Sequence, residues 1–279
     1  MDGSSNYNRI SIKIMENYNG KVVWVTGASS GIGEALAYSF AKKGASLILS
    51  GRNNEALELV KNNCLLFSEN CKVLPFDMLS IDQFPSIVQS ARNLFGRVDY
   101  LCNNAGMSQR SLIVDTPLEI DRKIMELDYF SQVALTKEII PLFIEQKSGH
   151  IVVISSVAGK YGFHYRSAYS AAKHALVGFF ETLRLELKDV PVHVTLVYPG
   201  RIHTNISINA LTSDGSKHGV MDDAQENGIA ADLCAEKITK AVLKRKVELL
   251  IGREELILVY MKRWFPSLYY KFVLKVKPE

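Results

Sequence analysis

Short apolar runs alternate with longer amphipathic stretches from Lys21 to near the end of the chain. Between the runs lie helical patterns such as GEALAYSFAKKG (33–44), in which apolar residues recur every three or four positions. Seven runs have the length of strands, and several are apolar on consecutive residues, as in strands covered on both faces: 21–26, 45–50, 71–76, 98–103, 150–155, 192–197 and 247–252. This alternation predicts one doubly wound α/β domain with a mostly parallel, seven-stranded sheet.

The pattern divides the chain into three parts. Residues 1–19 are polar and lack the apolar core of a secretory signal, so we expect a flexible N-terminal extension. Residues 20–252 form the α/β domain, within which the long irregular stretch 205–231 is expected to be a lid over the substrate. Residues 253–279 form a C-terminal segment rich in basic and aromatic side chains.

The composition excludes several classes of function. With 47% hydrophobic and 22% charged residues, the 279-residue chain is an ordinary globular protein, and a net charge of +4 gives no reason to expect nucleic acid binding. Four cysteines without metal-ligand spacing and six scattered histidines predict no metal site. We expect reduced thiols and a cytoplasmic location, with no stretch apolar enough to span a membrane.

The first strand leads directly into the turn TGASSGIG (26–33), where Gly27, Gly31 and Gly33 allow a tight turn and a close approach to a pyrophosphate. The helix that follows directs its N-terminal amides toward the anion. Glycines of a strand-to-helix turn can serve geometry alone, but the strand, turn and helix context favours a nucleotide-binding domain of the Rossmann type.

The end of the second strand predicts which nucleotide binds. A carboxylate is expected there for the ribose hydroxyls of NAD, but this chain has Arg52 in the stretch SGRN. A guanidinium suits the 2′-phosphate of NADP, so NADP is preferred to NAD. The alternative is that Arg52 is only a solvated loop charge.

The later strand ends also carry polar or glycine residues. Asp77 could accept a hydrogen bond from an adenine amino group or could simply form a turn. The amides of NNAG (103–106) can tie neighbouring strands together, Ser156 follows the fifth strand, and Thr204 could bond a carboxamide. In a parallel sheet these ends meet at one edge, where ligands bind.

The stretch YSAAK (169–173) places Tyr169 and Lys173 four residues apart, on one face of a helix. A lone pair of this spacing is more often an ordinary surface pair. Here it follows Ser156 by thirteen residues, in a chain that already carries the nucleotide-binding features.

The motifs TGASSGIG, NNAG, SSVAG, YSAAK and YPGRIHT, in this order over residues 20–206, resemble the short-chain dehydrogenase/reductase family. Within it, residues 159–187 are most similar to hydroxysteroid- and retinol-type reductases and to the member 7-like proteins. The resemblance implies that Tyr169 is the general acid of carbonyl reduction and the base of alcohol oxidation. A free phenol ionises only near pH 10, and Lys173 would favour the phenolate while holding the ribose hydroxyls.

The resemblance also implies that Ser156 donates to the substrate oxygen, so that Ser156 and Tyr169 bind the substrate, whereas Ser155 is structural. It assigns contacts with NADP to Gly27, Ser29, Ser30, Gly31, Ile32, Gly33, Arg52, Asn53, Asp77, Met78, Asn104, Ala105, Gly106, Tyr169, Lys173, Pro199, Ile202 and Thr204.

One position departs from the family pattern. In MELDYFSQVALT (125–136), Asp128 stands where Asn is usual, and the family residue supports the catalytic Lys through a kink and a water chain. We expect Asp128 to act on Lys173 from a distance. Charged, it would make the oxidation optimum alkaline; protonated, it would imitate the amide donor.

These features lead to three hypotheses. The first is an NADP(H)-dependent oxidoreductase for an apolar secondary alcohol or ketone, acting as a homodimer or tetramer. The second is a catalytically silent NADP-binding sensor or scaffold, which Asp128 alone favours. The third, compatible with either, is a peripheral membrane contact through 253–277. For that segment, a helix covering the substrate cleft or a dimer surface is the favoured alternative.

Overall fold

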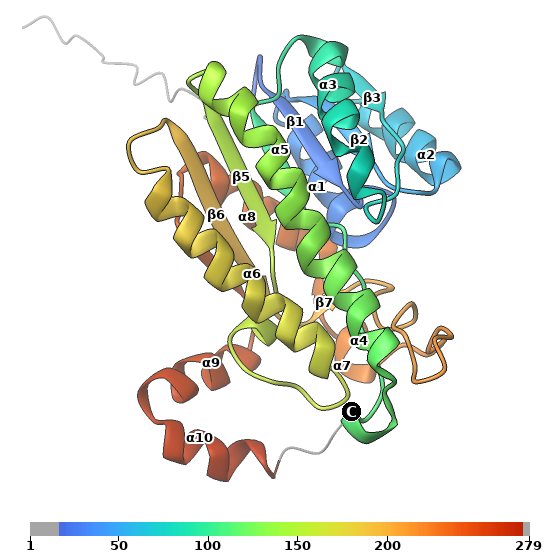
Figure 1. Ribbon diagram of the computed structural model, residues 1–279, viewed down its shortest axis with the longest axis vertical. Coiled ribbons are helices and arrows are strands. Elements are labelled where there is room, and N and C mark those ends of the chain that lie inside the picture. The colour runs from blue at the N-terminus through green and yellow to red at the C-terminus, as the bar shows by residue number, and fades with distance from the viewer. Residues whose placement is uncertain (1–16, 276–279) are drawn as a thin grey trace, which may run out of the picture.

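Seven strands form one sheet in the order β3-β2-β1-β4-β5-β6-β9, and every neighbouring pair is parallel (Figure 1). The computed structural model describes residues 17–275, so most of the predicted N-terminal extension lies outside the described part. The strands are β1 Val22–Thr26, β2 Ser46–Ser50, β3 Cys71–Val73, β4 Tyr100–Asn103, β5 Gly149–Ile154, β6 Val192–Pro199 and β9 Glu248–Ile251. The predicted fold class is confirmed, and the strand order reverses beside β1, between the branches that begin with β2 and β4.

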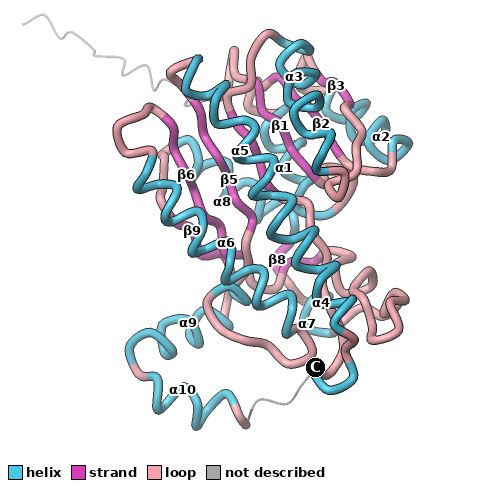
Figure 2. The backbone as a smooth tube through the Cα atoms, in the orientation of Figure 1, coloured by secondary structure: helices cyan, strands magenta, loops and turns pink. Residues whose placement is uncertain are grey.

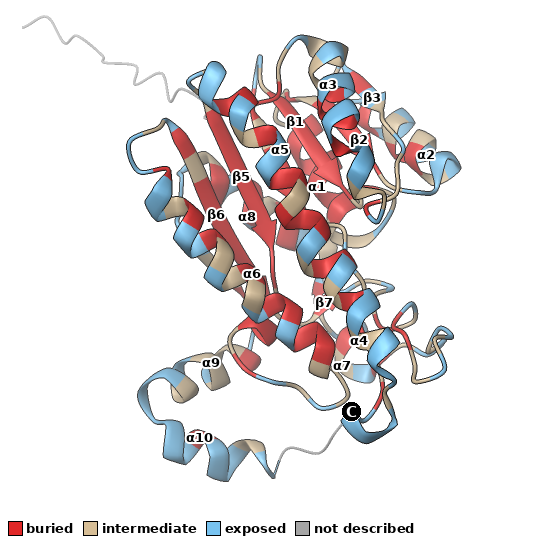
Figure 3. Cartoon of the chain, in the orientation of Figure 1, coloured by how far each residue is buried: buried red, intermediate tan, exposed pale blue. Residues whose placement is uncertain are grey.

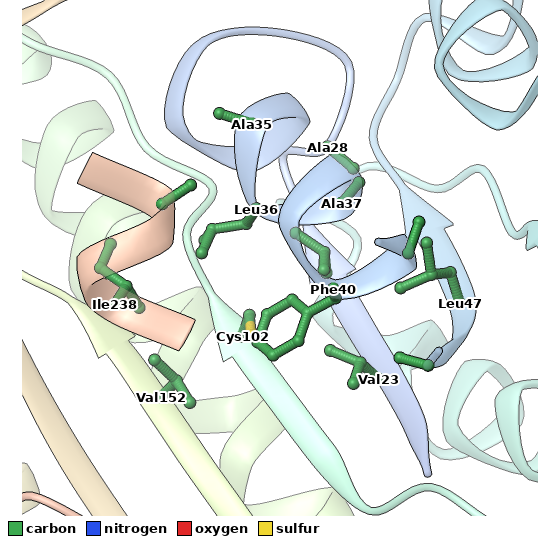
Figure 4. Close-up of a cluster of buried hydrophobic side chains, with 14 of the residues drawn as sticks. Val23, Ala28, Ala35, Leu36, Ala37, Phe40, Leu47, Cys102, Val152 and Ile238 are labelled. Atoms are coloured by element: carbon green, nitrogen blue, oxygen red, sulfur yellow. The ribbon is translucent and has the colours of Figure 1, made fainter. Parts of the chain in front are cut away.

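Helices cover both faces of the sheet. One face is covered by α1 Gly31–Ala41, α2 Asn54–Cys64 and α8 Ala231–Leu243, and the other by α3 Phe84–Phe95, α5 Ser131–Glu145 and α6 Ser167–Glu186. On the first face, Leu36 and Phe40 of α1 meet Ile238 of α8 above Val23 and Val152 of the sheet (Figure 4). Burial on both faces explains why the strands are continuous apolar runs in the sequence.

The shorter elements lie mainly at the carboxyl ends of the strands (Figure 2). They are α4 Leu118–Met125, a π-helical turn Glu126–Phe130 that joins α4 to α5, the strand pair β7 Ile202–His203 and β8 Ile229–Ala230, α7 Asp223–Glu226, α9 Glu255–Trp264, α10 Pro266–Val273, and the 3₁₀ turns Ile81–Gln83, Ile113–Asp115 and Val157–Gly159. The pairing of β7 with β8 brings the two ends of the predicted lid, 205–231, close together. The stretch 205–231 therefore starts and finishes close to this strand pair.

Most strand boundaries lie within two residues of those expected, and two differences have a clear physical reason. The third strand ends at Val73 rather than at residue 76, because Pro75 has no amide hydrogen to extend the ladder. The core also starts before residue 20: the Tyr18 ring is fully buried and packs edge-to-face on Phe40, and its hydroxyl donates to the carbonyl of Thr239 at 2.7 Å. The domain therefore includes Tyr18, which we had placed in the extension.

Candidate active site

The glycine-rich turn brings β1 very close to the start of α1. Gly27 has a φ of +63°, and a Cβ added at Gly33 would lie 2.1 Å from the carbonyl oxygen of Gly27. Any side chain at position 33 would therefore push the turn away from the helix. The Ser30 side chain forms no capping bond, so it leaves the first amides of α1 to an anionic ligand. These observations fit a bound pyrophosphate.

A cavity of about 610 Å³ lies at the carboxyl ends of the strands and extends from this turn to α6. Of the residues predicted to bind cofactor or substrate or to act in catalysis, only Gly33 does not line it, because it lies beneath the turn. The lining residues that we predicted are Gly27, Ser29, Ser30, Gly31, Ile32, Arg52, Asn53, Asp77, Met78, Asn104, Ala105, Gly106, Asp128, Ser156, Tyr169, Lys173, Pro199, Ile202 and Thr204.

The first turns of α6 carry the tyrosine and the lysine. Both side chains are largely buried, and Lys173 Nζ lies 5.4 Å from the centre of the Tyr169 ring. Ser156 follows β5, where its Oγ accepts from the amide of Ala158 at 3.1 Å and lies 3.3 Å from the carbonyl oxygen of Pro199. Ser156 therefore caps the 3₁₀ turn that follows β5, and it also lines the cavity.

Asp128 contacts Lys173 directly. Its Oδ2 lies 3.1 Å from Lys173 Nζ, and its Oδ1 accepts from the amide of Met107 at 2.7 Å. The carboxylate is fully buried in the π-helical turn, and a Cβ at Gly106 would come within 3.0 Å of it. The expectation of action from a distance was wrong, because the two charged groups form a buried ion pair.

The two groups of this pair titrate together. Burial is the largest single influence on the Lys173 ammonium and lowers its pKa, but Asp128 and Tyr169 together outweigh burial, and the pKa lies above its ordinary value. Burial raises the pKa of the Asp128 carboxyl, against the opposing effects of Lys173 and of the Met107 amide. The pair therefore keeps Lys173 protonated at alkaline pH.

Hydrogen bonds hold the strand ends around the cavity. Asn104 Nδ2 donates to the carbonyl oxygens of Thr26 at 3.0 Å and Gly27 at 3.2 Å, and so ties the end of β4 to the glycine turn. The Ser155 hydroxyl donates to the carbonyl of Lys173 at 3.1 Å, which is the structural role expected for it. These bonds fix the turn relative to α6.

At the nucleotide end of the cavity, two predicted residues also have local roles. The Asn53 side chain caps α2 by accepting from the amide of Ala56, and the Asp77 carboxylate accepts from the amide of Leu79 within a turn. Arg52 is exposed beside them. Among residues 17–275, no hydrogen bond or ion pair engages its guanidinium, which leaves it accessible to a ligand.

The sequence did not reveal a charged cluster at the other end of the cavity. Asp222, in the predicted lid, forms ion pairs with Arg110 at 3.2 Å and with Arg166 at 2.6 Å. Arg166 directly precedes α6 and lines the cavity. No local motif marks these three residues, because they lie 56 and 112 positions apart and meet only in the fold.

A second cavity of about 440 Å³ adjoins the first at Ser156 and Arg166. One wall comes from Tyr161 and its neighbours, and the other from side chains of α9 and α10. Its apolar lining includes Val157, Tyr161, Phe163, Leu258, Met261, Phe272 and Val273. An apolar group of a substrate could therefore extend from Ser156 toward the C-terminal helices.

Among the described residues, no group of three or more metal-ligating side chains is placed to hold a metal ion. In the same part of the chain, no helix has both the length and the apolar character needed to cross a bilayer.

Comparisons with known proteins agree with this geometry. The model of a family described as short chain dehydrogenase matches residues 21–214. A Drosophila melanogaster protein, Dehydrogenase/reductase SDR family protein 7-like, is 38% identical over 94% of this chain and 82% of its own length. The Mus musculus protein Dehydrogenase/reductase SDR family member 7B is 41% identical over 90% of this chain and 80% of its own length.

Solved structures have the same fold. A short-chain dehydrogenase/reductase from Burkholderia phymatum in complex with NAD superposes with a TM-score of 0.80 at 22% identity, over 94% of this chain and 98% of that one. A short-chain dehydrogenase from Streptomyces avermitilis has a TM-score of 0.76 at 27% identity, over 91% of this chain and 96% of that one.

Proposed function

Because the chain belongs to the short-chain dehydrogenase/reductase family, whose members are oxidoreductases acting on CH–OH groups with NAD or NADP, we propose that it interconverts a secondary alcohol and a ketone with NADP(H). The observation that carries the proposal is that Ser156, Tyr169 and Lys173 line the same cavity as the glycine-rich turn. When bound there, the nicotinamide of the cofactor would supply the hydride for reduction and accept it in oxidation.

In this mechanism the side chains of the protein move and hold the proton. During reduction, the Tyr169 hydroxyl donates a proton to the carbonyl oxygen of the substrate as negative charge develops there, and in oxidation the phenolate takes it back. Ser156 Oγ donates a hydrogen bond to the same oxygen. The Lys173 ammonium favours the phenolate of Tyr169. The ion pair with Asp128 holds this ammonium in place, one helical turn from Tyr169.

The experiment that tests the proposal is a screen of the purified protein with NADPH against steroid, retinoid, acyl and small carbonyl compounds, followed by NADPH absorbance. Because Tyr169→Phe deletes only the transferable proton, we expect it to reduce turnover roughly 10²–10⁴-fold and to leave NADPH affinity nearly unchanged. Substantial turnover by this variant would dismiss Tyr169 as the proton donor.

The preference for NADP rests on Arg52, whose exposed guanidinium lines the cavity beyond β2. We expect NADPH to bind at least roughly tenfold more tightly than NADH, a difference of about 1.4 kcal/mol. Arg52→Ala should abolish this difference when both affinities are measured by titration. Arg92→Ala is the matched control, because Arg92 pairs with Glu145 on the surface. An unchanged preference in Arg52→Ala would remove the argument.

The substrate that we propose is apolar, since side chains such as Tyr161, Phe163 and Leu258 line the second cavity, which adjoins Ser156. We also propose a homodimer or tetramer, which sedimentation velocity tests.

The buried carboxylate of Asp128, at the position where Asn is usual, favours a second candidate, a silent NADP sensor. If the native chain is inert with every carbonyl compound and Asp128→Asn is active, the sensor is the better account.

A further inference from the structure

The helices α9 and α10 expose an unusual concentration of large apolar side chains. Figure 3 shows α10 mostly exposed and α9 partly exposed, at one end of the molecule. Trp264, Phe265 and Leu274 are 69%, 64% and 79% exposed. Together with the other exposed apolar residues of this segment they form what we call the α9–α10 face: Ile257, Tyr260, Trp264, Phe265, Leu268, Tyr270, Phe272 and Leu274. Exposed apolar residues are normally scattered singly, so this clustering indicates a surface that meets a partner.

After Glu255, the described part of this segment carries only positive charge. Residues 256–275 contain Lys262, Arg263, Lys271 and Lys275 and no Asp or Glu. In the whole chain the 33 basic residues exceed the 29 acidic ones by four, so these four residues equal the entire excess. The remaining 29 basic and 29 acidic residues balance. Residues 256–275 therefore combine a charge of +4 with exposed apolar side chains.

Contacts on the inner side hold the two helices in this orientation. The Tyr269 ring is 3% exposed and packs edge-to-face on Tyr161. The Glu255 carboxylate accepts from the amides of Arg201 at 2.9 Å and Arg253 at 3.2 Å. Lys262 Nζ donates to the carbonyl of Lys160 at 3.0 Å. These contacts attach the inner side of the two helices to the domain, so the α9–α10 face points outward.

We propose that the α9–α10 face docks on the surface of an anionic lipid bilayer, with its aromatic and aliphatic side chains among the headgroups. Aromatic rings and long basic side chains are the residues that suit such an interface, since their apolar parts enter it while their charges meet lipid phosphates. A second copy of the chain fits less well, because a two-fold contact would bring Arg263, Lys271 and Lys275 against the same three residues of the partner. The inference is independent of the reaction proposed above.

Trp264 provides a local probe of this docking. The only other tryptophan, Trp24, is fully buried, so a change in fluorescence on adding vesicles reports Trp264. We expect a blue shift, and quenching by brominated lipid, with phosphatidylcholine vesicles that contain phosphatidylserine. Trp264→Phe keeps an aromatic ring at the face. It should still sediment with the vesicles while losing the fluorescence response.

The decisive experiment compares two double variants of the full chain by vesicle sedimentation. W264S/F265S should weaken binding to anionic vesicles at least roughly tenfold, because two large apolar groups no longer enter the interface. The matched control L59S/L66S alters side chains of similar exposure near α2 and should bind like the native chain. Thermal unfolding of both variants checks that each is folded.

Three outcomes would overturn the proposal. One is a native chain that does not sediment with anionic vesicles, and another is equal binding by the two double variants. The third is a dimer in sedimentation velocity that W264S/F265S dissociates while vesicle binding is absent, which would assign the face to a second copy. A stronger effect of salt on the native chain than on R263E/K271E would support the contribution of charge.

Discussion

The ion pair between Asp128 and Lys173 determines how the active site should respond to pH. The Asp128 carboxylate raises the pKa of Lys173, so the ammonium persists at alkaline pH while the adjacent negative charge opposes its field. In Asp128→Asn the ammonium is no longer opposed, and it favours the phenolate of Tyr169 more strongly. We expect the pH profile of alcohol oxidation to move to lower pH by about one unit.

The check is the pH dependence of kcat/KM for oxidation in the native chain and in Asp128→Asn. A shift to higher pH would contradict this expectation, and would show that Lys173 needs the Asp128 carboxylate to stay protonated. An unchanged profile would indicate that Asp128 is protonated and already behaves as the neutral amide would. Because the Asn side chain has nearly the same shape, the amide of Met107 keeps an acceptor in the variant.

Single residues also show where sequence reasoning reached its limit. The strand-end rule predicted that Ser156 lines the cavity, whereas Tyr169 and Lys173 were predicted there only through the resemblance of the motifs to the family. The direct contact of Asp128 with Lys173 was not predictable. This contact depends on the π-helical turn that carries Asp128 and on the absence of a side chain at Gly106. No pattern in the sequence predicts either feature.

At the scale of elements, the junction of β1 with α1 depends on a missing side chain. A Cβ at position 33 would lie 2.1 Å from the carbonyl oxygen of Gly27 and 2.5 Å from Asn104 Nδ2. Gly33→Ala should therefore displace the turn, weaken NADPH binding at least roughly tenfold and lower the thermal stability. Titration with NADPH and thermal melting would measure the two effects.

Gly178 offers the matched control. It lies within α6, and nothing lies within 4 Å of a Cβ placed there. Gly178→Ala should raise the free energy of unfolding by roughly 0.5–1 kcal/mol, because alanine favours the helix, and should leave NADPH affinity unchanged. If both variants bind NADPH like the native chain, the turn does not contact the cofactor.

The elements themselves were largely predictable, and the exceptions have physical reasons. All seven strands of the sheet were expected, because strands buried on both faces are continuous apolar runs. The strands β7 and β8 were missed because each has two residues and carries no periodicity. The cluster of Arg110, Arg166 and Asp222 was also missed, because its members come from separate loops that only the tertiary fold brings together.

At the scale of the molecule, the C-terminal helices are attached to a domain whose sheet is complete without them. The last strand ends at Ile251, and α9 and α10 contact the domain through Glu255 and Tyr269. A chain that ends at Gly252 should therefore remain folded and bind NADPH. It should lose activity on apolar ketones, because the wall formed by Leu258 and Phe272 is missing. NADPH titration and the carbonyl assay distinguish these effects.

An insoluble truncated chain, or one that no longer binds NADPH, would show that the segment belongs to the core of the domain. A full-length variant, Tyr269→Ala, separates packing from the length of the chain. It removes the one ring of α10 that is buried against Tyr161, and leaves the rest of the segment in place.

The second cavity has a kinetic consequence. Its wall is the inner side of the same two helices whose outer side forms the α9–α10 face, with Ile257 and Phe272 belonging to both. A carbonyl compound dissolved in the lipid would then reach Ser156 without first crossing bulk water. Turnover would follow the mole fraction of substrate in the bilayer, and adding inert lipid at constant total substrate would slow the enzyme by surface dilution.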